Sequence, residues 1–195
     1  MNLEINDALI PGTKLNKSDM GNVTGLEFLS KVFYISEGVM LSQIREVSGI
    51  DGSTLQNWTK RGWVANARLK KYNIDQVAHI LIINMLRSCI QLDHIAFLLQ
   101  YINGKIDDTS DDIIRDSVLY DYICRILEAL TRQDVASKAS IKETIREQIS
   151  DYNEVMEGAR ERLAKALEII ATAYYAALIK RSSDTMLAKL MSSAF

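Results

Sequence analysis

The amino-acid sequence predicts a mainly α-helical protein with a small β wing, and three observations lead to this fold class. Proline occurs once, as Pro11, so the strongest helix breaker is absent from the rest of the 195 residues. Apolar residues recur at helical spacing in segment after segment. Two short helical patterns on either side of Ser48-Gly49 are typical of a helix-turn-helix, and a short basic stretch after them is typical of a β wing.

The composition excludes several classes of protein. Hydrophobic residues make up 48% and charged residues 25%, as in ordinary globular proteins, and the net charge is −2. A nucleic-acid-binding surface must therefore be local. The N-terminus does not resemble a signal peptide, and the two cysteines indicate a reducing compartment, so we expect a cytoplasmic protein.

Three segments are predicted. Residues 1–38 form an N-terminal arm with a short helix, and residues 39–104 form a compact head punctuated by glycines. Residues 105–195 form a helical C-terminal region with one long helix at about 141–181. The boundary follows Gly104, where acidic residues cluster before the longer helical patterns begin.

The helix-turn-helix is predicted from apolar spacing within the head. Leu41, Ile44 and Val47 form one face of the first helix, and Gly49 ends it. In the second helix Leu55 and Trp58 point inward. This spacing leaves Thr54, Gln56, Asn57 and Lys60 outward or at the flank.

The segment Trp63–Tyr72 is too short for a helix and is predicted to be a two-stranded hairpin, with its turn at Asn66-Ala67. Asn73 then caps the next helix, with Gln76 three residues later completing a capping box. A further helix is predicted from Leu92 to Asn103-Gly104.

The head carries a local excess of positive charge. Between Leu41 and Tyr72 there are six basic and two acidic residues, and no acidic residue lies between Trp58 and Lys71. A solvent-exposed charge run is the common meaning of such a stretch. On the second helix and wing of a helix-turn-helix, however, it favours contacts to DNA phosphates.

The head also resembles a known family. The features are the stretches RGW (61–63), KKY (70–72), YNIDQ (72–76) and LDHIAFLLQYING (92–104). They are similar to the winged helix-turn-helix of the mercury-resistance-regulator (MerR) superfamily. The resemblance is closer to a bacterial family of uncharacterised proteins, a domain-of-unknown-function family with a MerR-like head.

The resemblance implies a dimeric, sequence-specific DNA-binding transcriptional regulator. By motif, Thr54, Gln56 and Asn57 fall at groove-facing positions, and Trp58 falls where a tyrosine near phosphate is usual. Gln and Asn favour adenine through bidentate contacts, and the cysteines of the mercury-sensing branch are absent. The candidate DNA-binding residues are Thr54, Gln56, Asn57, Lys60, Arg61, Arg68, Lys70 and Lys71.

The C-terminal region contains a regular heptad pattern, which begins after a predicted capping box at Ser140 and Glu143. The pattern favours a dimer contact over an intramolecular bundle helix, although seam length alone does not separate the two, and Gly158 lies within it as a point of bending or breakage. The candidate dimer-interface residues are Ile149, Tyr152, Met156, Leu163 and Ile170.

No enzymatic motif, cofactor site or metal site is predicted. The aspartates between 107 and 112 lack the spacing of a calcium loop and instead suit the first turn of a helix from Ile113. His79 and His94 are each more typical of a polar contact than of a ligand, and Cys89 and Cys124 suggest buried thiols. The alternative function is a winged-helix adaptor for protein interactions, or a sensor of an unidentified small-molecule effector, that does not bind DNA.

Overall fold

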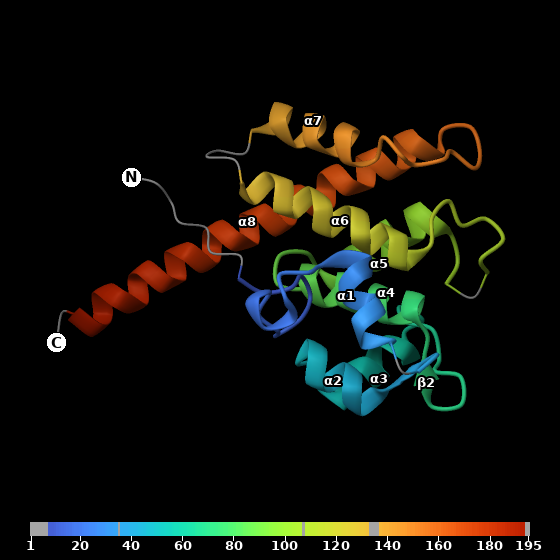
Figure 1. Ribbon diagram of the computed structural model, residues 1–195, viewed down its shortest axis with the longest axis horizontal. Coiled ribbons are helices and arrows are strands. Elements are labelled where there is room, and N and C mark those ends of the chain that lie inside the picture. Colours follow the sequence, from blue (N-terminus) through green and yellow to red (C-terminus); the bar gives the residue numbers. More distant parts are fainter. Residues whose placement is uncertain (1–7, 35, 107, 133–136, 194–195) are drawn as a thin grey trace.

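The computed structural model describes residues 8–34, 36–106, 108–132 and 137–193. These are mainly helical and include one two-stranded antiparallel sheet, which confirms the coarse fold class (Figure 1). The elements in chain order are a 3-10 turn Ser18–Met20, α1 Gly25–Val32, β1 Val39–Met40, α2 Leu41–Ser48, α3 Gly52–Lys60, β2 Lys71–Tyr72, α4 Ile74–Leu86, α5 Leu92–Asn103, α6 Asp116–Thr131, α7 Lys138–Gln148 and α8 Ala159–Ser193.

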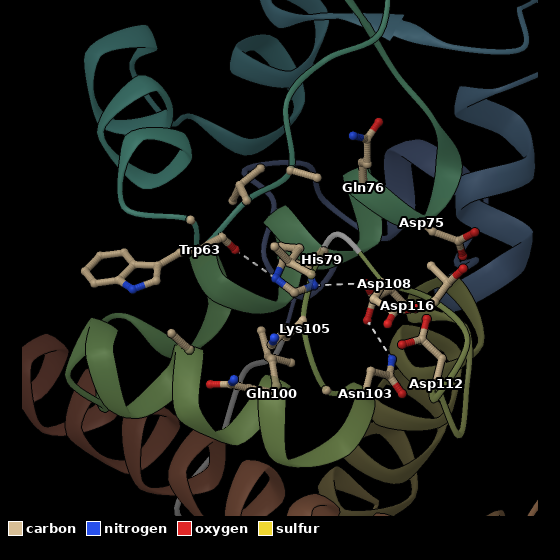
Figure 2. A pocket seen from close by; sticks show the side chains of 18 of the residues that line it. Trp63, Asp75, Gln76, His79, Gln100, Asn103, Lys105, Asp108, Asp112 and Asp116 are labelled. Carbon is tan, nitrogen blue, oxygen red and sulfur yellow. Dashed lines mark hydrogen bonds and ion pairs between the residues drawn. The ribbon is translucent and has the colours of Figure 1, made fainter.

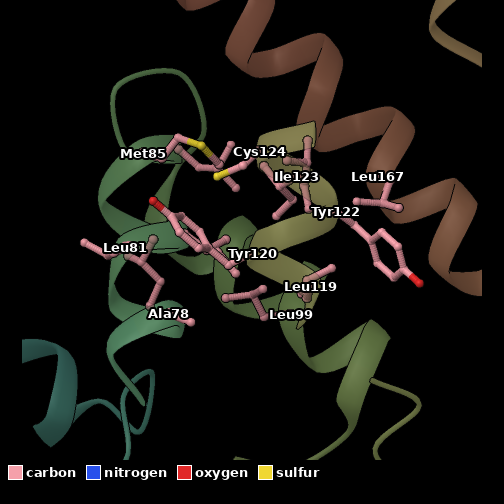
Figure 3. Close-up of a cluster of buried hydrophobic side chains, with 14 of the residues drawn as sticks. Ala78, Leu81, Met85, Leu99, Leu119, Tyr120, Tyr122, Ile123, Cys124 and Leu167 are labelled. Carbon is pink, nitrogen blue, oxygen red and sulfur yellow. The ribbon is translucent and has the colours of Figure 1, made fainter. Parts of the chain in front are cut away.

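Helix α6 lies at the centre of the core and packs against α1, α4, α7 and α8. Figure 3 shows the cluster between these helices, with Tyr120 and Cys124 of α6 facing Leu81 and Met85 of α4. Burial of such side chains is the main source of stability in a fold of this size. In Figure 1, α2, α3 and β2 lie at the end of the molecule opposite α7.

The N-terminal arm packs on this core. Ile10 is fully buried, and the hydroxyl of Tyr120 donates a hydrogen bond to the carbonyl of Pro11 at 2.7 Å. The arm is therefore part of the core and contacts α6 through Tyr120.

The helix ends that carry local capping signals agree with the sequence. The side chain of Asn73 accepts from the Gln76 amide and that of Gln76 accepts from the Asn73 amide, which is the predicted capping box of α4. The termination of α5 at Asn103-Gly104 is also confirmed. By contrast, α6 begins at Asp116, not at Ile113 as predicted, and α7 is capped by Ser137, not by Ser140.

The predicted single helix over 141–181 is wrong. Helix α7 ends at Gln148 and α8 begins at Ala159, after Gly158 with a left-handed φ of +79°. The guanidinium of Arg160 donates to the carbonyls of Ile149 and Tyr152, and the Tyr152 hydroxyl donates to the Ile113 carbonyl at 2.9 Å. These contacts hold the chain in a reversal, after which α8 runs back alongside α7.

The heptad seam consequently packs within the chain. Ile149, Tyr152, Leu163 and Ile170 are all buried in its own core, whereas Met156 in the reversal is 43% exposed. Four of the five residues predicted at a dimer interface are thus unavailable to a second copy in this structure. Their regular spacing reflects an intramolecular bundle, the alternative that the sequence left open.

The second half of α8 extends away from the body toward the C-terminus (Figure 1). From Ile179 onward nearly every residue of α8 is exposed. Among the helices of the described residues, none is both long and apolar enough to cross a membrane.

Candidate nucleic-acid interface

Helices α2 and α3 are joined by a tight turn at residues 49–51. Gly49 adopts a left-handed conformation with φ +72°, which a side chain would strain, and its amide caps α2. Ile50 is buried, and its amide donates to the Ser48 hydroxyl at 3.2 Å. The turn therefore has one defined path, which fixes α3 relative to α2.

Asp51 caps the N-terminus of α3. Its carboxylate accepts from the amide of Thr54 at 2.8 Å and from the hydroxyls of Ser53 and Thr54, and these bonds hold the pKa of Asp51 below its usual range. The hydroxyl proton of Thr54 is committed to this cap. Thr54, a predicted groove-facing residue, is half-buried and can only accept at a further partner.

The two faces of α3 differ sharply. Leu55 and Trp58 are each 1% exposed and belong to the core, as predicted. Gln56, Asn57 and Lys60 are exposed on the other side. Because Trp58 is buried, it cannot take the phosphate-contacting role that its position in the motif suggested.

The predicted hairpin exists in a different form. Strand β2 pairs with β1, so Val39 lies opposite Tyr72, and its pairing with the residues after Trp63 is limited to one bridge to Arg68. The tight turn is at Leu69-Lys70, not at Asn66-Ala67. Arg68 and Lys71 exchange two backbone hydrogen bonds of 2.9 Å across it.

This turn places an apolar side chain at its tip. Leu69 and Lys70 both have left-handed φ, +49° and +63°, the backbone of a type I′ turn. Leu69 is 97% exposed. Local sequence patterns carried no signal for this turn, because turns of its type normally have Asn or Gly at these positions.

The predicted cations surround α3 and the turn, and all are exposed. The guanidinium of Arg61, at the C-cap of α3, lies 5.0 Å from the centroid of the Trp63 ring and 3.4 Å from the Asn57 side-chain oxygen. Arg61 and Arg68 both line a groove that lies between the segment after α3 and helix α5. These cations lie in α3, in β2 and in the segment between them, and Figure 1 shows α3 and β2 at one end of the molecule.

The groove has a volume of about 1480 Å³ and lies between the segment after α3, the start of α4, and α5 (Figure 2). On its acidic side, burial and the neighbouring carboxylates, with Asp116 first among them, raise the pKa of Asp112 to about 6. Across the part of the chain that the structure describes, no group of acidic, histidine or cysteine side chains has the arrangement of a metal site.

His79 lies in this groove and joins two parts of the chain. One ring nitrogen, Nδ1, is 2.9 Å from the carboxylate of Asp116 on α6, and the other, Nε2, is 3.0 Å from the carbonyl of Trp63. The predicted role as a polar contact is confirmed for His79, whereas His94 is exposed. Local sequence patterns could not predict that His79 pairs with Asp116, because these two residues are 37 positions apart in the chain.

The helices, the small sheet and the basic end define a mainly helical protein whose candidate interface lies between α2 and β2. The chain belongs to the family described as "Domain of unknown function (DUF1836)", which matches residues 26–123, half of its length. The matched region includes the whole candidate interface. An uncharacterised bacterial family was the sequence-based expectation, and this part of it is confirmed.

A curated relative is the uncharacterized protein YkrK of Bacillus subtilis (strain 168). It is 31% identical over 137 residues, which cover 68% of this chain and 55% of YkrK. The chain therefore spans about half the length of this relative. No solved structure matches the chain.

Proposed function

We propose that this protein is a sequence-specific, DNA-binding transcriptional regulator that acts as a dimer. In this proposal α2 and α3 are the helix-turn-helix of a MerR-like winged head, and the turn at 68–71 is its wing. The observation that carries the proposal is the set of exposed cations around the free face of α3 and that turn. Cations so placed can neutralise phosphates on both sides of a groove.

The free face of α3 supplies the groups for base recognition. Gln56 and Asn57 are exposed amides at consecutive positions between the cap at Asp51 and the cations at its end. Such amides form bidentate hydrogen bonds with adenine in the major groove. The apolar tip at Leu69, flanked by Arg68 and Lys70, has the chemistry of a wedge in a minor groove.

The dimer contact is assigned to the projecting half of α8, because the heptad seam is buried within the chain. Ile179, Met186, Leu187 and Leu190 recur at helical spacing and are 43% to 64% exposed. The segment 179–193 is about 22 Å long, from the rise of an α-helix. Two copies of this segment packed side by side would cover both apolar stripes. They would also place two heads in a two-fold arrangement that matches a palindromic site.

The test is selection of bound sequences from genomic DNA fragments by the purified protein at about 50 mM salt, the permissive condition for phosphate contacts. We expect enrichment of one sequence. Lys70→Ala or Lys71→Ala should weaken binding to all sequences and lower the salt slope by about 1. Gln56→Ala or Asn57→Ala should instead cost about 1–3 kcal/mol on the preferred site alone.

Lys142→Ala is the matched control, because it removes one positive charge from α7 at the opposite end of the molecule. It should leave DNA affinity unchanged. Absence of DNA affinity at low salt would overturn the proposal and favour the adaptor or sensor.

A further inference from the structure

Both ring nitrogens of His79 face atoms that accept hydrogen bonds. The Trp63 carbonyl, 3.0 Å from Nε2, cannot donate, and an ionised Asp116 carboxylate, 2.9 Å from Nδ1, cannot donate either. A neutral imidazole carries only one N–H, so both bonds form together only when the ring is doubly protonated. The ring is buried, so water cannot replace a missing partner cheaply.

The charged groups around the ring favour that doubly protonated form. Burial alone would lower the pKa of His79, but the charge and hydrogen bond of Asp116, the Trp63 carbonyl and the charge of Asp112 together raise it above its usual value. Asp75, one turn earlier on α4, is already bonded to the Arg115 guanidinium.

The remaining polar neighbours are occupied or lie in the open groove. On α5, the side-chain amide of Asn103 donates to the Ile114 carbonyl at 2.6 Å and lies 3.4 Å from the second oxygen of Asp116. Lys105 lines the same groove and is exposed. Among these side chains, Asp116 alone therefore shares the proton on Nδ1 of His79.

We propose that His79, Asp116 and the Trp63 carbonyl form a proton-operated joint that holds the basic segment after α3 against the helical region. Its effect on DNA affinity rests on the function proposed above. Trp63 lies two residues after Arg61 and opens the segment that carries Arg68 and the turn. A change at its carbonyl therefore acts on the placement of these cations.

The joint opens when the pair gives up one proton to solvent. Neutral His79 keeps a single N–H, which stays with the Asp116 carboxylate because a charge-assisted hydrogen bond is the stronger of the two. The lone pair of Nε2 then faces the lone pairs of the Trp63 carbonyl oxygen at 3.0 Å. This contact is repulsive, so the segment separates from α4.

The sign of the pH dependence follows. The folded-state pKa of His79 lies above its usual value, so the closed joint is fully present below that usual value and is lost as pH rises through the folded-state pKa. DNA affinity at constant salt should fall about threefold to tenfold, the change expected from one net hydrogen bond.

Asp116→Asn is a matched variant that holds the joint closed without the titrating proton. The side-chain amide introduced at position 116 can donate to Nδ1 while neutral His79 keeps its proton on Nε2 and donates to Trp63. The carboxamide oxygen of the variant remains toward Asn103. DNA affinity of this variant should not change over the pH range in which that of the wild type falls.

The direct test is NMR of the histidine ring nitrogens from about pH 6 to about pH 9, a range that spans the usual histidine pKa. The variant His94→Gln leaves His79 as the single histidine. We expect a doubly protonated ring at the low end of this range that loses one proton as pH rises. The Val64 amide, in the peptide unit that contains the Trp63 carbonyl, should shift with the same midpoint.

A ring that stays neutral throughout, or a Val64 amide that does not follow the ring, would overturn the joint. If both signals behave as expected and DNA affinity is absent at every pH, the joint stands and the DNA-binding function fails. If the wild type binds DNA with an affinity that does not change with pH, the regulatory role of the joint is wrong.

Discussion

The side-chain amide of Asn84, in the last turn of α4, donates a hydrogen bond to the carbonyl of Ser48, the last residue of α2, at 3.0 Å. Its second N–H donates to the carbonyl of Gly12 in the N-terminal arm at 2.8 Å. The side chain of Asn84 thus links α2 to the N-terminal arm, and it provides a donor for two carbonyls at the edge of the core.

Asn84→Ala should lower the free energy of unfolding by about 1–2 kcal/mol, because two partly buried carbonyls lose their donor. The measurement is chemical denaturation. Asn66→Ala is the control, since the Asn66 side chain is exposed and its loss should change stability by less than about 0.5 kcal/mol. Equal stability of the two variants would show that the Asn84 bonds contribute nothing net.

The turn at Leu69-Lys70 stores backbone strain. Leucine rarely adopts a left-handed φ, and this conformation costs about 1–2 kcal/mol for a residue with a side chain like leucine. Leu69→Asn should therefore raise the free energy of unfolding by about 0.5–1 kcal/mol, since asparagine tolerates this region and Leu69 makes little contact with the core.

Leu69→Ala separates strain from exposure, because it removes the apolar side chain and keeps the Cβ. It should bring no comparable gain in thermal stability. A gain as large in Leu69→Ala as in Leu69→Asn would attribute the effect to the exposed side chain and not to the backbone.

The two cysteines should react differently. Cys124 is buried, and burial raises its pKa to about 12, so its thiol is protonated and covered at neutral pH. Cys89 is exposed, which contradicts the expectation of two buried thiols, although partial burial also raises its pKa. The folded protein should therefore label at one thiol with a small reagent, slowly at neutral pH and faster as pH rises.

The second thiol should label only after unfolding. Cys89→Ser should abolish labelling of the folded protein, and Cys124→Ser should leave its stoichiometry at one. Labelling of both thiols in the folded state would mean that α6 opens readily, against its central place in the core.

The sequence predicted best those features that depend on neighbouring residues. The capping box of Asn73 and Gln76, the turn at Gly49 and the exposure of Gln56 all follow from local chemistry. Periodicity also separated the buried Trp58 from the outer face of α3.

The features that it missed depend on contacts far along the chain. The heptad spacing is compatible with one long helix, and the break depends on Arg160 bonding the carbonyls of the reversal and on Tyr152 reaching Ile113. Strand β2 pairs with β1, which precedes α2 and α3 in the chain, and local patterns could not predict this distant pairing. The turn therefore lies at Leu69-Lys70 and not at the predicted Asn66-Ala67.

The projecting half of α8 provides the test of the proposed dimer. The double variant Leu187→Glu and Leu190→Glu places two negative charges on the apolar stripe of each chain. We therefore expect light scattering at micromolar concentration to show a dimer for the wild type and a monomer for the variant. Both residues are exposed, at 57% and 64%, so the fold and its melting temperature should change little. Thr185→Glu is the matched control, because position 185 lies on the opposite side of α8 and should leave the dimer intact.

A wild-type monomer, or equal dissociation by the control, would show that this stripe does not join two copies. A monomer that still bound a palindromic site with full affinity would also remove the geometric reason for a dimer.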